Sequence, residues 1–169
     1  MPTWNLADLY PANDAPELLP NESAADKFID NAFAAGGEPL LTLPMLGWVP
    51  KSRGDDVSYS VKKYGGQDAA LGDAGNGKQG GKAVANDKTD AARSVGTEYV
   101  TAWMRHIAER VGTAKQGGVR FFALDNEMTL WPETHRDVHP EPVTYDEIWD
   151  KTVAYATAVK AQDPDAKLF

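Results

Sequence analysis

Residues 119–127 read VRFFALDNE, and this stretch decides which fold the chain predicts. Its first six residues are nearly all apolar or aromatic, which is typical of a short strand buried within a sheet. Asp125, Asn126 and Glu127 follow at the carboxyl end of that strand. Enzymes built on parallel sheets bind their ligands at this end of the strands. Glu127 is therefore a candidate catalytic carboxylate, and the alternative is an ordinary surface carboxylate in a turn.

Further strand patterns lie on both sides of this segment. Residues 40–43 (LLTL) predict a second buried strand, residues 57–61 (VSYSV) alternate in polarity and predict a third, and residues 167–169 have the character of a strand start. Strands that alternate with helices along a chain imply a parallel sheet. We expect residues 40–43 and 119–124 to be parallel neighbours in it.

Three segments with apolar residues at helical spacing predict helices at about 23–35, 94–111 and 145–162. A serine can cap the first of them, and Thr144 begins a capping box at the last. We expect these helices to pack outside the sheet. The inner face of the last helix is expected to carry Tyr145, Ile148, Trp149, Thr152, Ala156 and Val159.

Composition limits the classes of function. The chain has 169 residues, is 42% hydrophobic and carries a net charge of −8. The acidic balance argues against nucleic acid as a partner, because phosphate binding needs clustered Lys and Arg. No apolar run approaches the length that a bilayer requires, so no membrane partner is expected. Residues 1–20 are rich in proline, predict irregular structure and contain no recognisable signal peptide. The chain has no cysteine, so cysteine-based zinc sites and disulfides are excluded.

Residues 50–93 predict a long irregular insert within a single domain that spans residues 1–169. Seven of the fifteen glycines lie between Gly65 and Gly81, and so many glycines predict no packed element there. The run from Gly75 to Gly80 matches the dinucleotide fingerprint G-x-G-x-x-G, but no strand precedes it and no amphipathic helix follows, so we reject a nucleotide site. Asp68 and Asp73 leave open a calcium site in the insert, although their spacing is not that of a regular calcium loop.

Several runs together carry a resemblance to a known family. They are residues 40–49 (LLTLPMLGWV), 59–65 (YSVKKYG), 117–119 (GGV), 123–127 (ALDNE), and 130–140, which contains LW and THRDVHP. In these runs the chain resembles glycoside hydrolase family 44, and the resemblance extends from about Pro39 to Phe169. The resemblance implies a partial (β/α)8 TIM barrel of the α/β class, from about its second helix to its fourth, with the glycine-rich insert after the third strand. It also implies an endo-acting β-1,4-glucanase, in many members active on xyloglucan.

The resemblance implies a role for the pair at the end of the central strand. In related retaining glycosidases an Asn-Glu pair ends the fourth barrel strand, and its Glu is the general acid/base. Here the pair is Asn126-Glu127, followed by Met128 where the family usually has proline. A retaining glycosidase needs a second, nucleophilic carboxylate, and we expect none in this chain, because that residue lies on a later strand in the family. Asn126 would hydrogen-bond the 2-hydroxyl of the sugar.

Substrate contacts are expected beyond the strand ends. Trp48 and Trp131 would form a wall on which sugar rings stack, at the same rim as Glu127, and the alternative is that both are core residues. His135 and His139 would be hydrogen-bond donors lining the cleft. Their four-residue spacing also permits a metal site, which the nearby prolines make the weaker interpretation. Glu133 is a rival carboxylate in mid-loop.

The expected partner is a β-1,4-glucan or xyloglucan chain, with no cofactor and no metal. The resemblance implies an extracellular protein, because polymeric glucan lies outside the cell. Two hypotheses remain open: a fragment of a retaining endo-β-1,4-glucanase that holds the acid/base, and a non-catalytic glucan-binding or structural fragment. They differ in whether a second carboxylate completes the site.

Overall fold

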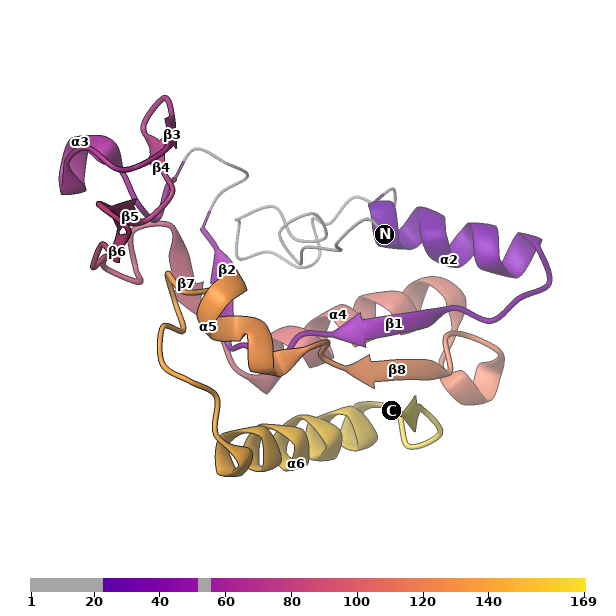
Figure 1. The fold of residues 1–169 in the computed structure, drawn as a ribbon. Helices are drawn as coiled ribbons and strands as arrows, with labels where there is room; N and C mark the ends of the chain where they lie inside the picture. Colours follow the sequence, from indigo (N-terminus) through magenta and orange to yellow (C-terminus); the bar gives the residue numbers. More distant parts are fainter. Residues whose placement is uncertain (1–22, 52–55) are drawn as a thin grey trace.

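The computed structural model describes residues 23–51 and 56–169, and Figure 1 shows their arrangement. The irregular segment predicted for residues 1–20 lies outside the described residues. A small parallel sheet forms the centre, with helices against it. A group of short hairpins projects from the end of the sheet towards which the strands β1 and β8 run (Figure 1).

The central sheet has three parallel strands in the order β1-β8-β9. Strand β1 spans Leu40–Leu43, β8 spans Phe121–Leu124 and β9 spans Lys167–Leu168. Leu43 is paired in register with Leu124, so β1 and β8 end side by side. This confirms the predicted pair of parallel neighbours and the strand start at the last residues. Trp48 and Glu127 both follow these carboxyl ends, as expected of residues at one rim.

The three predicted helices are present as α2 (Ala24–Ala34), α4 (Thr97–Val111) and α6 (Tyr145–Gln162). Ser23 caps α2, because its side chain accepts a hydrogen bond from the amide of Asp26. The Thr144 hydroxyl accepts in the same way from the amide of Glu147. Helix α4 begins three residues later than predicted, since residues 92–94 pair as a strand instead.

One buried core joins the sheet to the helices. It combines residues from β1 and β8 with one face each of α2, α4 and α6. Its members include Ile29, Leu41, Leu43, Val100, Trp103, Ile107, Phe122, Tyr155 and Val159. The helical periodicity therefore predicted part of the buried faces of α2 and α4, such as Ile29, Trp103 and Ile107, because apolar stripes pack where water is excluded.

The predicted inner face of α6 is partly wrong. Tyr145 is 80% exposed and Trp149 is 59% exposed, and Val153 continues the same line along the helix. Tyr155 and Val159 are the buried residues of this helix. We call the line Tyr145, Trp149 and Val153 the α6 stripe. It lies beside the buried face, so the apolar surface of the helix is wider than the part that the described residues cover.

We predict that the chain self-associates through the α6 stripe, because contiguous exposed apolar patches mark surfaces that bind other molecules. In sedimentation velocity the 169-residue chain should show larger species as its concentration rises. Trp149→Glu should restore the monomer by placing a charge in the stripe. The isolated apolar residue Leu71, 88% exposed on the insert, supplies the control variant Leu71→Glu, which should leave association unchanged. A wild-type chain that stays monomeric at high concentration contradicts this prediction.

The insert begins and ends at the carboxyl side of β1. Strand β2 (Trp48–Pro50) pairs antiparallel with β7 (Ala92–Ser94), and this pair closes the base of the insert. The strand predicted at residues 57–61 is wrong: residues 61–64 form the short helix α3 (Val61–Tyr64). Ser60 caps that helix by accepting from the amide of Lys63, so a local side-chain bond overrides the alternating pattern.

The glycine-rich part of the insert is more regular than predicted. It forms two antiparallel pairs of two-residue strands, β3 with β4 and β5 with β6. Their bounds are Ala70–Leu71, Ala74–Gly75, Lys78–Gln79 and Lys82–Ala83. The run that matches the dinucleotide fingerprint lies across these hairpins, and β6 follows it rather than a helix. Glycines at positive φ make the tight turns, which is why a glycine-rich sequence still builds an element here.

Candidate active site

Glu127 lies three residues beyond the end of β8, on a strained backbone. Its φ is 47° and ψ 45°, and Asp125 has φ 62°. These are the two residues other than glycine with positive φ in the described part of the chain. Left-handed backbone is costly for such residues and gathers at functional sites. The side chains of Asn126 and Glu127 are both exposed, so this turn presents an amide and a carboxylate to the space beyond the strands.

Asp125 holds the turn in place. Its amide donates to the carbonyl of Leu43 (2.8 Å), and its Oδ2 accepts from the amide of Met45 (2.5 Å). Its Oδ1 accepts from the amide of Asn126 (2.7 Å). One carboxylate thus fastens the exit of β1 to the exit of β8. The sequence alone assigns Asp125 no role, although its place at the first position after the strand is an available signal.

The chain leaves Glu127 as a short helical segment. The carbonyl of Glu127 accepts from the amide of Leu130 (2.8 Å), which opens the 3₁₀ turn η3 (Met128–Leu130) and then α5 (Trp131–Thr134). A residue before proline is pushed towards extended backbone. The left-handed conformation of Glu127 therefore fits Met128 at the next position and would be disfavoured by proline there.

Trp131 is a core residue. Its side chain is 2% exposed, its ring lies 5.4 Å from that of His139, and the Lys151 ammonium stands 5.3 Å from the ring centroid. The expected sugar-stacking role for Trp131 is therefore wrong for this structure, and the core alternative holds. The ring belongs to the buried core and has no open face. Trp131 instead supports the segment that carries Glu127.

Lys151 of α6 ties the helix to the exit of β1. Its ammonium donates to the carbonyls of Met45 (3.0 Å) and Leu46 (3.2 Å). Burial lowers the pKa of Lys151, while the charges of Glu147 and Asp125 oppose that shift. The sequence does not predict this contact, because an isolated lysine on a helix gives no signal of a distant backbone partner.

The two predicted histidines are joined by a backbone hydrogen bond from the amide of His139 to the carbonyl of His135 (2.7 Å), but their side chains differ in surroundings. His139 Nε2 lies 2.9 Å from Glu147 Oε1, and its ring packs beside Trp131, so it faces α6. His135 is exposed on the loop after α5. Trp48, half-buried in β2, keeps part of its ring accessible. The rival Glu133 is exposed on α5.

Among residues 23–51 and 56–169, no group of three or more His, Cys, Asp or Glu side chains could hold a metal ion. The two carboxylates considered for calcium serve the turns of the insert. Asp68 accepts from the amides of Gly80 (2.6 Å) and Gly81 (2.8 Å). Asp73 accepts from the amide of Lys62 and the hydroxyl of Ser60, both at 2.8 Å.

These bonds predict that acid loosens the insert. The Lys62 amide, and then the Ser60 hydroxyl, hold the pKa of Asp73 below its ordinary value of 3.8. A lowered pKa in the folded state means that folding releases a proton, so the stabilisation is present above about pH 4 and is lost as pH falls through the lowered pKa. The protection factor of the Lys62 amide, which is the intrinsic exchange rate at each pH divided by the rate measured by NMR, should fall between about pH 5 and 2. Asp73→Asn, which cannot titrate, should remove the pH dependence; an unchanged profile contradicts this assignment.

The sequence profile of glycoside hydrolase family 44 matches residues 4–169. The match extends over nearly the whole chain. The protein belongs to glycoside hydrolase family 44.

Known proteins are similar to the chain in sequence and structure. The structure of CelM2, a bifunctional glucanase-xylanase protein from a metagenome library, is 39% identical with a TM-score of 0.81, over 85% of this chain and 30% of that one. A xyloglucanase from Paenibacillus polymyxa is 28% identical with a TM-score of 0.56, over 86% and 27%. Endoglucanase A of Paenibacillus lautus is 29% identical over 143 residues, which are 84% of this chain. The chain therefore has the fold of part of a glycoside hydrolase.

The chain spans 19% of the length of Endoglucanase A and 10% of a beta-mannanase/endoglucanase A from Caldicellulosiruptor saccharolyticus. It thus corresponds to a limited part of these proteins. Within the described residues, no helix is both long enough and apolar enough to cross a membrane.

Proposed function

We propose that the chain is the part of a retaining endo-β-1,4-glucanase that carries the general acid/base, Glu127. The observation that carries this proposal is the position of Glu127 three residues after β8, on a strained turn fastened by Asp125. A catalytic carboxylate must be held in a fixed direction, and rigid strand ends supply that. Membership of family 44 supports the same role.

The order of elements supports a placement within a (β/α)8 barrel. Helix α2, strand β1, helix α4, strand β8 and helix α6 follow one another, with the insert between β1 and α4. We assign them to the second helix, third strand, third helix, fourth strand and fourth helix of the barrel. In this placement β9 is the fifth strand.

The proposed chemistry is a double displacement. A nucleophilic carboxylate from another part of the longer protein attacks the anomeric carbon, while the protonated Glu127 gives its proton to the departing glycosidic oxygen. Glu127 then takes a proton from the water that releases the sugar from the nucleophile. Asn126, exposed beside Glu127, would hydrogen-bond the sugar 2-hydroxyl, a bond that strengthens in the transition state.

The substrate we propose is a β-1,4-glucan or xyloglucan. Relatives named for action on these classes support it: an endoglucanase, a glucanase-xylanase and a xyloglucanase. Trp48 remains the aromatic candidate for a sugar contact at the rim, and His135 remains a candidate hydrogen-bond donor. His139 would contribute to the site indirectly, through its contact with Glu147 of α6. Such polymers lie outside the cell, which supports an extracellular site of action.

The alternative, a non-catalytic glucan-binding fragment, differs in its need for a second carboxylate. The 169-residue chain alone should hydrolyse xyloglucan negligibly, whereas the longer protein should hydrolyse it and release first a product that keeps the β configuration at the anomeric carbon. Reducing-sugar release and proton NMR of the first product test both points. An inactive longer protein that still binds glucan would favour the alternative, and an inverted first product would exclude double displacement.

A further inference from the structure

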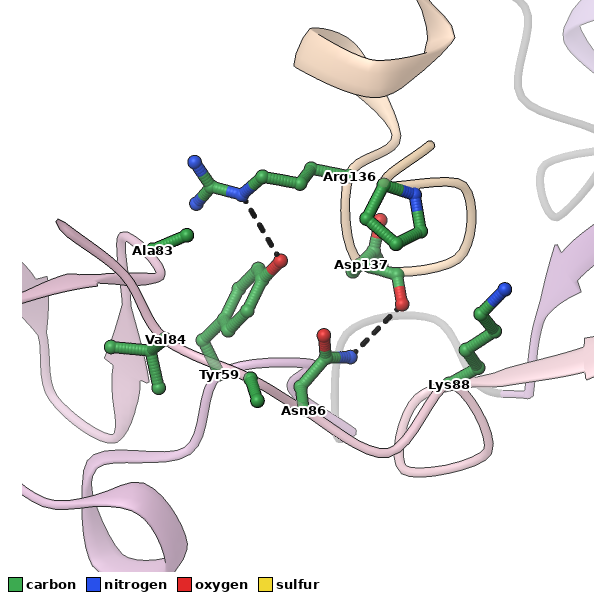
Figure 2. Close-up of a pocket in the computed structure, with 9 residues that line it drawn as sticks. Tyr59, Ala83, Val84, Asn86, Lys88, Arg136 and Asp137 are labelled. Atoms are coloured by element: carbon green, nitrogen blue, oxygen red, sulfur yellow. Dashed lines mark hydrogen bonds between the residues drawn. The ribbon is translucent and has the colours of Figure 1, made fainter. Parts of the chain in front are cut away.

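A cavity of about 280 Å³ lies between the insert and the loop that follows α5 (Figure 2). We propose that it binds one neutral pyranose unit of a glucan chain, as an accessory subsite at the same end of the sheet as Glu127. Its lining includes Tyr59, Val84, Asn86, Lys88, Arg136 and Asp137. The proposal rests on the proposed function, because it takes the ligand to be part of the same substrate.

The walls of the cavity are fixed before any ligand arrives. Arg136 donates to the hydroxyl of Tyr59 (3.3 Å) and to the carbonyls of Asn76 (3.1 Å) and Gly77 (2.9 Å). Asn86 Nδ2 donates to the carbonyl of Asp137 (3.0 Å). These bonds join the two sides of the cavity, as Figure 2 shows for Arg136 with Tyr59 and for Asn86 with Asp137. A preformed site loses little entropy when it binds.

Gly77 explains part of the glycine-rich run. It has φ +69°, and a Cβ there would lie 2.5 Å from Arg136 Nη2 and 2.8 Å from the ring of Tyr59. A side chain at this position would force apart the pair that forms one wall. The run that matches a dinucleotide fingerprint therefore includes a glycine needed for close packing in this wall, with no phosphate involved.

Polar groups remain available for a ligand. Asn86 uses its Nδ2 for hydrogen bonds, and its Oδ1 accepts none from the described residues. Lys88 makes no hydrogen bond or ion pair within the same part of the chain, and Arg136 uses Nε and Nη2 there but not Nη1. The carboxylate of Asp137 already accepts from the Ser58 hydroxyl (2.5 Å). One acceptor and two donors on side chains that line the cavity thus remain without a partner among the described residues.

The apolar part of the lining fits the faces of a sugar ring. Tyr59 and Val84 offer carbon surface beside these polar groups, and ligand sites typically combine a mainly apolar wall with a few placed polar groups. The volume lies near the lower end for ligand pockets, so it suits one ring rather than a length of chain. Contacts remote from the reacting bond can supply binding energy to a polysaccharide hydrolase.

The test is a titration of the ¹⁵N-labelled 169-residue chain with cellotetraose and with a xyloglucan heptasaccharide, followed by amide shifts. We expect saturable shifts at residues 84–88 and 136–137. Lys88→Met, which removes a donor, and Val84→Phe, which fills the cavity, should each weaken binding about tenfold. Lys82→Met is the matched control on exposed β6 and should change the Kd less than twofold. Circular dichroism checks that each variant keeps the fold.

The outcomes separate this proposal from the proposed function. Absence of shifts at these residues, or shifts that neither Lys88→Met nor Val84→Phe weakens, would overturn the accessory subsite. Shifts confined to residues 125–128 would overturn it while supporting glucan binding beside Glu127. Sodium glucuronate is the counter-probe: binding tighter than that of methyl β-glucoside would overturn the neutral-sugar assignment. Retained shifts at the cavity in Glu127→Gln would support a subsite independent of the acid/base.

Discussion

Glu127→Gln in the longer protein is expected to slow xyloglucan hydrolysis by about 10²–10⁴-fold, the usual contribution of general acid–base catalysis. The amide keeps the size and the hydrogen-bonding shape of the side chain but has no proton to transfer. The side chain is exposed, so the variant should melt like the wild type. The measurement is kcat/KM on xyloglucan, with a thermal melt of both proteins.

The leaving group tells an acid/base from a residue that merely binds. An aryl β-cellobioside should lose much less rate in the glycosylation step, because a phenolate departs with little protonation. Azide should then restore part of the turnover by replacing the water that Glu127 would activate, and it should yield a β-glycosyl azide. Glu133→Gln, six residues further on at an exposed position of α5, is the matched control and should keep full activity. Equal rates of the wild type and Glu127→Gln on both substrates would remove Glu127 from catalysis.

The sequence alone predicted the parts of the fold that depend on local patterns. Residues 40–43 and 119–124 are apolar runs of strand length, and both are strands. The helices capped by Ser23 and Thr144 begin where the caps stand, since a side-chain acceptor at that point satisfies free amides. Two parallel strands with polar residues after them also sufficed to bring Trp48 and Glu127 to one rim.

Contacts between distant segments account for what the sequence did not predict. Alternation at residues 57–61 indicated a strand, but Asp73 binds Ser60 and Lys62 and leaves a capped turn there. The side of α6 that holds Trp149 has no cover in the described structure, and periodicity alone cannot tell a buried flank from an open one. Lys151 and Asp125 act on backbone atoms of Met45, a partner that no spacing along the sequence reveals.

The rim around Glu127 also depends on packing, and Trp131→Ala should show how strongly. Removing a fully buried Trp leaves a cavity and is expected to lower the free energy of unfolding by about 3–5 kcal/mol. The loss should be felt at the site itself, because Trp131 lies four residues after Glu127 and packs against His139 and the ammonium of Lys151. The hydrogen bonds from the Lys151 ammonium to the backbone after β1 would then lose the apolar cover of the Trp131 ring, and water would reach them.

Trp149→Ala is the matched control, since it deletes the same side chain from a position that is 59% exposed. Urea unfolding of both variants, at a concentration low enough to keep the chain monomeric, should show a large shift of the midpoint for Trp131→Ala. For Trp149→Ala the change should stay within about 0.5 kcal/mol, as is usual at exposed positions. If Trp131→Ala lowers the free energy of unfolding no more than Trp149→Ala does, the ring of Trp131 is not part of the core. In the longer protein Trp131→Ala should also lower kcat, because an acid/base on a loosened turn spends less time in the reactive geometry.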